Sequence, residues 1–292
     1  MRVSVVIAYL ACALIWGTTY FAIRICIAAG GYPTYLAAAL RFVIAALILG
    51  AFVAFGWARP APRGVRAYAW LMLAGLLNFG GYALVYTAEE SIPGALGAVI
   101  YGTAPLMTAI VAALSGTERA TRLAVVGALV SLAGIALISW DRLTVSSSQA
   151  AGVVMVLLSV MLASSYNVVL KRQAGGQHPM ATNAVFLGTT ALAMSVLALA
   201  VGKPMPWPPP VGPTVAVLYL AVIGSVVAFA SYFYLLQRVR LMTSSTLVLL
   251  PPIVALVVDA IWEAQKIAPL TYVGAGVTLA GVGMNLFLGK RE

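Results

Sequence analysis

Apolar stretches of about 20 residues follow one another along the whole chain, separated only by short polar connections, and stretches of this kind are typical of transmembrane helices. Charged residues make up 8% of the sequence and hydrophobic residues 63%, whereas a soluble globular domain is roughly a quarter charged. No stretch is long and polar enough to form a soluble domain, and too few polar residues remain to cover a water-soluble core. We therefore predict an all-α integral membrane protein.

The apolar pattern predicts ten transmembrane helices joined by short connections. The longest connections, residues 56–64 and 203–210, are rich in Gly and Pro, as loops are. The first apolar stretch is too long for a signal peptide and lacks a basic leader. The predicted helices cover residues 3–28, 34–56, 67–87, 92–114, 122–139, 151–170, 181–201, 213–236, 242–262 and 269–288.

One twelve-residue stretch occurs twice. Residues 123–134 read LAVVGALVSLAG and residues 270–281 read LTYVGAGVTLAG, with eight of the twelve positions identical. The offset is 147 residues, about half of the 292-residue chain, and it also carries Pro105 onto Pro252. We therefore predict two copies of a five-helix unit. The copies cover residues 1–140 and 148–289.

The basic residues alternate between the predicted loops. Twelve of the seventeen lie on one side, and the other side has only Arg142, Lys203 and Lys266. The positive-inside rule then places both termini in the cytoplasm. It also explains the net charge of +10 without a nucleic-acid partner. Because each copy has an odd number of helices, the second copy must be inverted, and inverted repeats are a transporter architecture.

Several short motifs occur in a fixed order. Residues 16–24 read WGTTYFAIR, and Leu40-Arg41-Phe42 lies in the second predicted helix. They are followed by Tyr86-Thr87-Ala88, Thr103-Ala104-Pro105-Leu106, Glu118 and Gly127 to Gly134, and then by Leu250-Pro251-Pro252, Glu263 and Gly274 to Gly281. The set resembles the EamA family of the drug/metabolite transporter (DMT) superfamily, and is similar to bacterial amino-acid and metabolite exporters.

The resemblance implies ten helices in two inverted five-helix repeats and export of small organic solutes across the inner (plasma) membrane. It also implies a central cavity formed by helices 1, 3, 4, 6, 8 and 9. The two halves depart from each other at Trp16, matched by Ala163, and at Arg41, matched by Gly188. We expect alternating access about a mid-membrane site, with a neutral or aromatic amino acid or a related metabolite as the solute.

Polar and aromatic residues lie in the middle of the six helices that the resemblance assigns to the cavity. Aromatic faces with a few hydroxyl or amide groups suit a moderately apolar organic solute. For a single Ser or Thr, a bond within the bilayer to its own helix or to a neighbouring one, worth roughly 0.6 kcal/mol, is the commoner role. The candidate cavity residues are Trp16, Thr19, Tyr20, Asn78, Tyr82, Tyr101, Tyr166, Asn167, Tyr232 and Ser245.

Pro105 and Pro252 lie in the middle of the fourth and ninth predicted helices. A proline removes one backbone donor and leaves a carbonyl unpaired, which at membrane depth is tolerated only against protein or a water-filled cavity. The two prolines are candidate hinges beside the solute path, with packing kinks as the alternative. Gly127, Ser131 and Gly134 share one helix face, which predicts close helix packing within the chain or at an oligomer contact.

Other functional classes find little support. The one histidine, His178, lies in a loop, and no pair of acids lies within the predicted helices, so we expect no metal, no cofactor and no enzymatic activity. An intramembrane enzyme and a receptor-like membrane protein are the alternatives of another class. Within transport, the alternative is a proton-coupled drug/metabolite antiporter, and flux that ignores an imposed pH gradient would favour a uniporter. We expect a monomer or a weak homodimer.

Asp259 is the one acid well inside a predicted helix, and Arg24 and Arg41 are the basic residues within helices. Intramembrane charges usually pair or face a cavity. Since these residues lie towards the outer ends of their predicted helices, our hypothesis is that Asp259 pairs with one of the arginines and closes the outer mouth. Arg24 can instead extend to the membrane surface, so Arg41 is the stronger candidate.

Asp259→Asn and Arg41→Ala should each lower the export rate, because each removes one charge of the predicted pair. Solute export from cells expressing the variants measures this. Wild-type rates in both variants would contradict the hypothesis.

Overall fold

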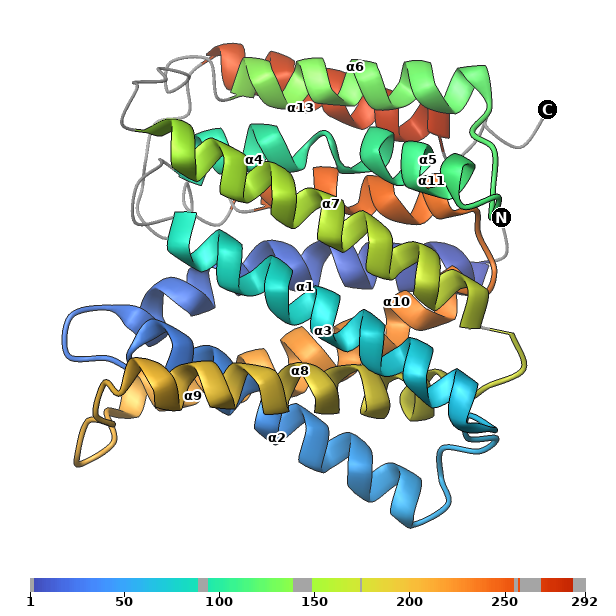
Figure 1. The fold of residues 1–292 in the computed structure, drawn as a ribbon. Coiled ribbons are helices and arrows are strands. Elements are labelled where there is room, and N and C mark those ends of the chain that lie inside the picture. The colour runs from blue at the N-terminus through green and yellow to red at the C-terminus, as the bar shows by residue number, and fades with distance from the viewer. Residues whose placement is uncertain are drawn as a thin grey trace. The chain divides into compact units, whose positions relative to one another are not determined.

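The computed structural model of the chain describes residues 3–88, 94–138, 149–173, 175–254, 257 and 269–285, and every element in this part is helical (Figure 1). The elements are α1 Val3–Ile27, α2 Thr34–Ala54, α3 Val65–Ala88, α4 Gly94–Tyr101, α5 Ala104–Leu114, α6 Arg122–Ile138, α7 Ala150–Gln173, α8 Pro179–Val201, α9 Val211–Ala221, the π-helix η3 Val222–Val227, α10 Ala228–Leu236, α11 Leu241–Ser245, the 3-10 helix η4 Thr246–Leu249 and α13 Pro269–Gly283.

Among the described residues, six helical segments are long and apolar enough to cross a membrane, and three shorter apolar helices are Val99–Leu114, Arg122–Ile138 and Leu241–Val254. The bounds of α1, α2, α3, α7 and α8 lie within three residues of the predicted ends. The prediction of an all-helical chain of apolar spans is confirmed over the described residues. The number of ten crossings and the side of the termini stay predictions.

The chain forms two compact units, and each unit draws on both sequence repeats. Unit 1 comprises Met1–Ala83 and Val169–Arg238, and unit 2 comprises Leu84–Val168 and Val239–Glu292. Two of the boundaries fall inside α3 and α7. The repeats and the compact units are therefore different divisions of the chain, one of sequence and one of packing.

Unit 2 is built on α6 and α13, which lie side by side (Figure 1). Ser131 Oγ donates to Thr278 O at 3.1 Å, and Thr278 Oγ1 lies 3.4 Å from Ser131 O. The two residues are 147 positions apart, which is the repeat offset. A residue that contacts its own repeat mate in this reciprocal way lies at a local two-fold axis, as in an isologous interface.

Glycines allow the two backbones to meet. A Cβ on Gly134 would lie 2.6 Å from Gly274 O, and one on Gly127 would lie 2.8 Å from Gly281 O. Such a distance leaves no room for any side chain, which is the reason small residues mark helix contacts in membranes. The predicted packing face is thus confirmed, and its partner is the other copy of the same stretch within the chain.

Unit 1 is arranged in a similar way around α2 and α8, which occupy matching positions in the two repeats and pack along each other. Helix α1 packs on α9 and α10, and α2 also contacts α9 and η3. The buried face of α2 includes Ala38, Phe42, Ala45 and Leu49. The one charged residue on that face is Arg41, which is buried as well.

The fourth and ninth predicted helices are both interrupted just before their prolines. Helix α4 ends at Tyr101 and α5 begins at Ala104, with Pro105 in its first turn. In the second repeat the chain tightens into η4 before Pro251 and Pro252. Residues 102–103 and 249–250 are 147 positions apart, so both repeats depart from α-helix at the same place.

Gly134→Ala should lower the melting temperature of the purified protein, because the added methyl meets the α13 backbone; overpacking of this kind costs about 1–3 kcal/mol. Gly276→Ala in α13 is the matched control, since a Cβ there meets nothing within 4 Å. That variant should be neutral or slightly stabilising, because alanine favours a helix over glycine by about 0.5–1 kcal/mol. Equal melting temperatures for the two variants would contradict the close contact.

Candidate functional site

A buried arginine stands out in unit 1. Arg41, in α2, is 2% exposed. Its Nε donates to Ser225 Oγ at 2.9 Å, and its Nη2 donates to Gly224 O at 3.1 Å. The guanidinium carbon lies 5.1 Å from the ring centre of Phe42 and 5.8 Å from that of Tyr82, within the range of cation–π attraction. Neutral oxygen atoms and aromatic rings therefore surround this cation.

Both acceptors belong to the π-helix η3, which lies between α9 and α10. A π-turn widens the helix and is often found at functional sites. Ser225 Oγ donates to Leu220 O at 2.9 Å while it accepts from Arg41, and the Gly224 carbonyl accepts the second arginine bond. The irregular turn and the buried arginine therefore form one structural feature.

Gly224 makes room for two neighbouring helices. A Cβ at this position would lie 3.0 Å from Thr19 Cγ2 and 3.6 Å from Arg41 Nη2. Thr19 donates to Trp16 O at 2.7 Å, so its hydroxyl oxygen still has acceptor capacity. We call Thr19, Arg41, Tyr82, Gly224 and Ser225 the arginine cluster.

Charge is divided unequally between the two units. Unit 1 contains ten basic residues and no Asp or Glu, whereas unit 2 contains seven basic and seven acidic residues. Arg41 thus has no carboxylate within its own unit. The acids are Glu89, Glu90, Glu118, Asp141, Asp259, Glu263 and Glu292.

An aromatic cluster occupies another part of unit 1. The ring centre of Trp16, in α1, lies 5.6 Å from that of Phe229 and 5.3 Å from that of Tyr232, both in α10. Phe186, in α8, lies 5.6 Å from Phe229 and 5.7 Å from Phe233. These separations suit aromatic pairing. Two residues predicted for the cavity, Trp16 and Tyr232, are thus brought into contact.

A second buried polar contact in unit 1 mirrors the arginine contact. Asn78 Nδ2, in α3, donates to Thr190 Oγ1, in α8, at 3.1 Å. Asn78 and Ser225 are 147 positions apart. Ser225 therefore bonds a helix of the first repeat, and its mate Asn78 bonds a helix of the second. These polar side chains join the two repeats within unit 1.

In unit 2, the break between α4 and α5 is held by α7. Tyr101 OH, at the end of α4, lies 2.6 Å from Ser159 Oγ, and Thr108 Oγ1, in α5, donates to Ser164 Oγ at 3.1 Å. Both halves of the interrupted helix are thus anchored to one continuous helix. Tyr166 and Asn167 follow in α7, where Tyr166 is half-buried and Asn167 is buried.

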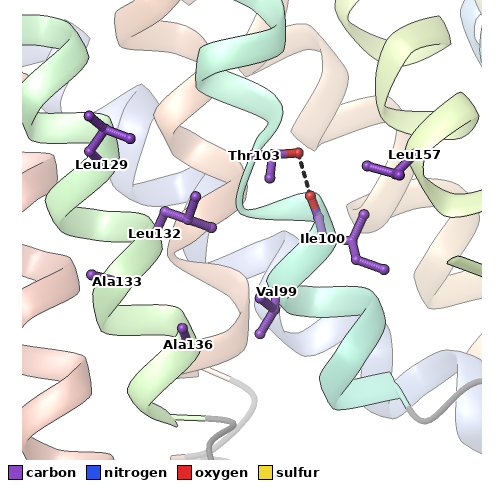
Figure 2. Close-up of a pocket in the computed structure, with 8 residues that line it drawn as sticks. All are labelled: Val99, Ile100, Thr103, Leu129, Leu132, Ala133, Ala136 and Leu157. Atoms are coloured by element: carbon purple, nitrogen blue, oxygen red, sulfur yellow. Dashed lines mark hydrogen bonds between the residues drawn. The ribbon is translucent and has the colours of Figure 1, made fainter. Parts of the chain in front are cut away.

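Figure 2 shows an apolar hollow of about 390 Å³ beside this break. Thr103 Oγ1 donates to Ile100 O at 2.6 Å across the interruption, so the one hydroxyl in the lining is already engaged with backbone. The hollow suits a hydrocarbon group better than the polar end of a solute. Its lining residues are Val99, Ile100, Thr103, Leu129, Leu132, Ala133, Ala136 and Leu157.

Four further residues from the sequence prediction are Ser245, Arg24, Asp259 and Tyr20. Ser245 Oγ donates to Met242 O in its own helix at 2.8 Å. Arg24 is exposed, with its guanidinium carbon 5.7 Å from the Phe21 ring centre. Asp259 and the side chain of Tyr20 lie outside the described residues. The predicted ion pair of Asp259 with an arginine stays a prediction.

One buried amide was not among the residues predicted from the sequence. Asn183, in α8, is fully buried, and neither its nitrogen nor its oxygen has a hydrogen-bond partner among the described residues. An asparagine in an apolar stretch was the available signal, but the sequence does not tell a bonded amide from an unbonded one. Burial of an unpaired polar group is costly, so this residue weakens the fold unless it has a role of its own.

The family comparison and the two relatives described below all indicate a transporter. Residues 3–140 and 150–287 match the EamA-like transporter family. The "uncharacterized inner membrane transporter YedA" of Escherichia coli K12 is 26% identical over 284 residues, which cover 97% of this chain and 90% of the relative. A "probable terminal-alkyne amino-acid exporter" of Streptantibioticus cattleyicolor is 27% identical over 285 residues, which cover 95% of this chain and 92% of the relative.

A crystal structure of a protein 20% identical in sequence superposes with a TM-score of 0.80 and covers 100% of this chain and 99% of that one. At this identity the likeness shows the fold alone.

Asn183→Leu should raise the melting temperature, because it removes an unpaired buried amide that costs about 1–3 kcal/mol. Asn78→Leu is the matched control and should lower the melting temperature, because it breaks the bond to Thr190. Thermal unfolding of both purified variants measures this. A similar loss of stability in both would show that Asn183 has a partner after all.

Proposed function

Because the chain belongs to the EamA-like transporter family over both of its halves, we propose that it exports amino acids or related small metabolites across the inner membrane by alternating access. Membership makes it a multi-pass inner-membrane transporter of small-molecule solutes, like its relatives. The solute class, the direction and the mechanism are our proposal.

The observation that carries this proposal is the pair of helix interruptions at matching positions of the two repeats. One lies at residues 102–103 and the other at residues 246–250. Interrupted helices leave backbone groups unpaired, and at membrane depth such groups are tolerated only against protein or a water-filled cavity. In transporters of inverted-repeat architecture, interrupted helices form the solute site.

The first interruption is built to act as a hinge. Helices α4 and α5 are each tied to α7 through a buried hydroxyl, Ser159 or Ser164. Between these ties, Gly102 lies against α6, where a Cβ would be 3.0 Å from Leu132 Cδ1. A change in the angle between α4 and α5 therefore concentrates at residues 102–103, where the α-helix is interrupted.

The local two-fold axis at Ser131 and Thr278 supports the inverted arrangement of repeats 1–140 and 148–289. Ten crossings with both termini in the cytoplasm follow from that arrangement together with the distribution of basic residues. Inversion matters for function because a two-fold axis in the membrane plane makes the outward-open and inward-open states nearly equivalent.

The solute class rests on the lining chemistry and on one relative. Trp16 and Tyr232 present aromatic surface in unit 1, and the arginine cluster adds a cation and a hydroxyl. A cation and a hydroxyl suit a carboxylate group, and aromatic surface suits an apolar side chain, which are the groups of a neutral or aromatic amino acid. The Streptantibioticus cattleyicolor relative is described as a probable amino-acid exporter, which agrees with this class.

Purified protein in liposomes should move labelled neutral and aromatic amino acids down their gradients faster than protein-free liposomes do. Pro105→Ala and Pro252→Ala should each lower the rate, because they allow a continuous helix where the chain is interrupted. Pro179→Ala, in the first turn of α8, where a proline breaks no helical bond, is the matched control and should keep the wild-type rate. Absence of flux for every member of the solute panel would contradict the proposed function.

A further inference from the structure

We propose that Arg41 is the residue that binds the carboxylate group of the transported solute. The inference rests on the proposed function and adds the chemical group that the solute must carry. Unit 1 contains no Asp or Glu anywhere in its sequence, yet it buries Arg41 to 2% exposure. A buried cation in a membrane normally has an anionic partner or faces a water-filled path.

The guanidinium group has unused binding capacity. Arginine carries five N–H groups arranged as a planar fork. Ser225 and Gly224 accept from two of them, and no described residue accepts from the other three. Nη1 in particular donates to no described atom. One edge of the fork is thus held by η3, while another edge can take a carboxylate in the two-bond geometry that arginine and carboxylate prefer.

The present partners of Arg41 are acceptors that a carboxylate can outcompete. A hydroxyl and a backbone carbonyl are both neutral, and a hydrogen bond between two charged groups is roughly twice as strong as one between neutral groups. A solute carboxylate can therefore bind beside these contacts or displace one of them. When the solute leaves, Ser225 and Gly224 keep the guanidinium partly bonded, so the empty site does not collapse.

A purely structural role does not account for the charge. If Arg41 only held the π-turn, a neutral amide donor such as glutamine could bond the same two oxygen atoms without placing a charge in the bilayer. The surrounding groups instead preserve the charge, because the Phe42 and Tyr82 rings attract a cation. The site is therefore suited to keep arginine charged and incompletely bonded until an anion arrives.

The test compares solutes that differ only at the carboxylate. Leucine and phenylalanine are measured beside leucinamide and phenylalaninamide, both for flux in proteoliposomes and for binding to the purified protein. The wild-type protein should bind each acid roughly 10- to 100-fold more tightly than its amide, the ratio expected for hydrogen bonds to a charged group. Arg41→Gln should remove this preference, and Arg41→Lys should keep part of it, because lysine retains the charge but lacks the fork.

Arg238→Gln makes the same chemical change at an exposed arginine, which stacks on Tyr234, and it should leave the preference unchanged. Melting temperatures of all variants separate loss of binding from loss of folding. A folded Arg41→Gln protein that still prefers the acid would overturn the inference, and so would a wild-type protein that treats acid and amide alike.

Asp259→Asn tests an internal counter-charge. Loss of the acid preference in this variant to the same degree as in Arg41→Gln would show that the partner of Arg41 is an acid of the protein, and would overturn the inference. An unchanged preference supports it. A wild-type protein that moves no solute at all overturns the proposed function itself, which is a different result from flux without a carboxylate preference.

Discussion

The contact between the two copies of the repeated stretch is the constraint on which unit 2 depends. In a bilayer, apolar side chains gain little by leaving lipid for protein, so helices associate through close packing and interhelical hydrogen bonds. Helices α6 and α13 supply both, with glycines that admit the partner backbone and with hydroxyls that bond across the contact. Because each helix belongs to a different repeat, neither repeat can form this contact alone. The duplication is thus required for packing in unit 2.

Departures from regular α-helix occur where a neighbouring side chain can use the backbone groups that they release. At η3 the released carbonyl of Gly224 bonds Arg41, and at the α4–α5 break Thr103 caps the carbonyl of Ile100. The bilayer interior offers no water to do this. An irregular turn there persists only with a protein partner. At η3 that partner is Arg41, which couples the turn to α2, and at the break the Tyr101–Ser159 contact couples the end of α4 to α7. Movement of α2 would therefore be transmitted to η3, and movement of α7 would be transmitted to the α4–α5 break.

Most of the helices could be predicted from the sequence. The hydrocarbon thickness of the bilayer fixes their length, and polar residues are rare within them and gather at their ends. The two proline-linked interruptions could be located too, since proline has a local effect on its own helix. The π-turn could not. Residues 222–227 contain no proline, and the side chain that bonds the turn, Arg41, lies more than 180 positions earlier.

The side-chain contacts were harder to predict than the residues that make them. Arg41, Thr19 and Tyr82 were all identified as candidates, but their assembly around Gly224 depends on helix rotation, which a nearly uniform apolar sequence leaves undetermined. The pairing of Asn78 with Thr190 was hidden for the same reason. The repeat offset gives information on helix rotation that the apolar pattern does not. Positions 78 and 225 are repeat mates, and each carries a polar residue that bonds a helix of the other repeat.

The unequal distribution of charge distinguishes Arg41 from the other basic residues of unit 1 as a candidate for binding an anionic group. Nine of the ten basic residues in unit 1 lie in loops or near helix ends, where water or lipid headgroups can neutralise them. Arg41 lies about 10 Å along α2, at 1.5 Å per residue, and is buried among helices. An internal ion pair would neutralise it permanently and would compete with any anionic solute. A solute carboxylate neutralises the arginine only while the solute is bound. The net charge of the site therefore differs between its empty and its occupied state.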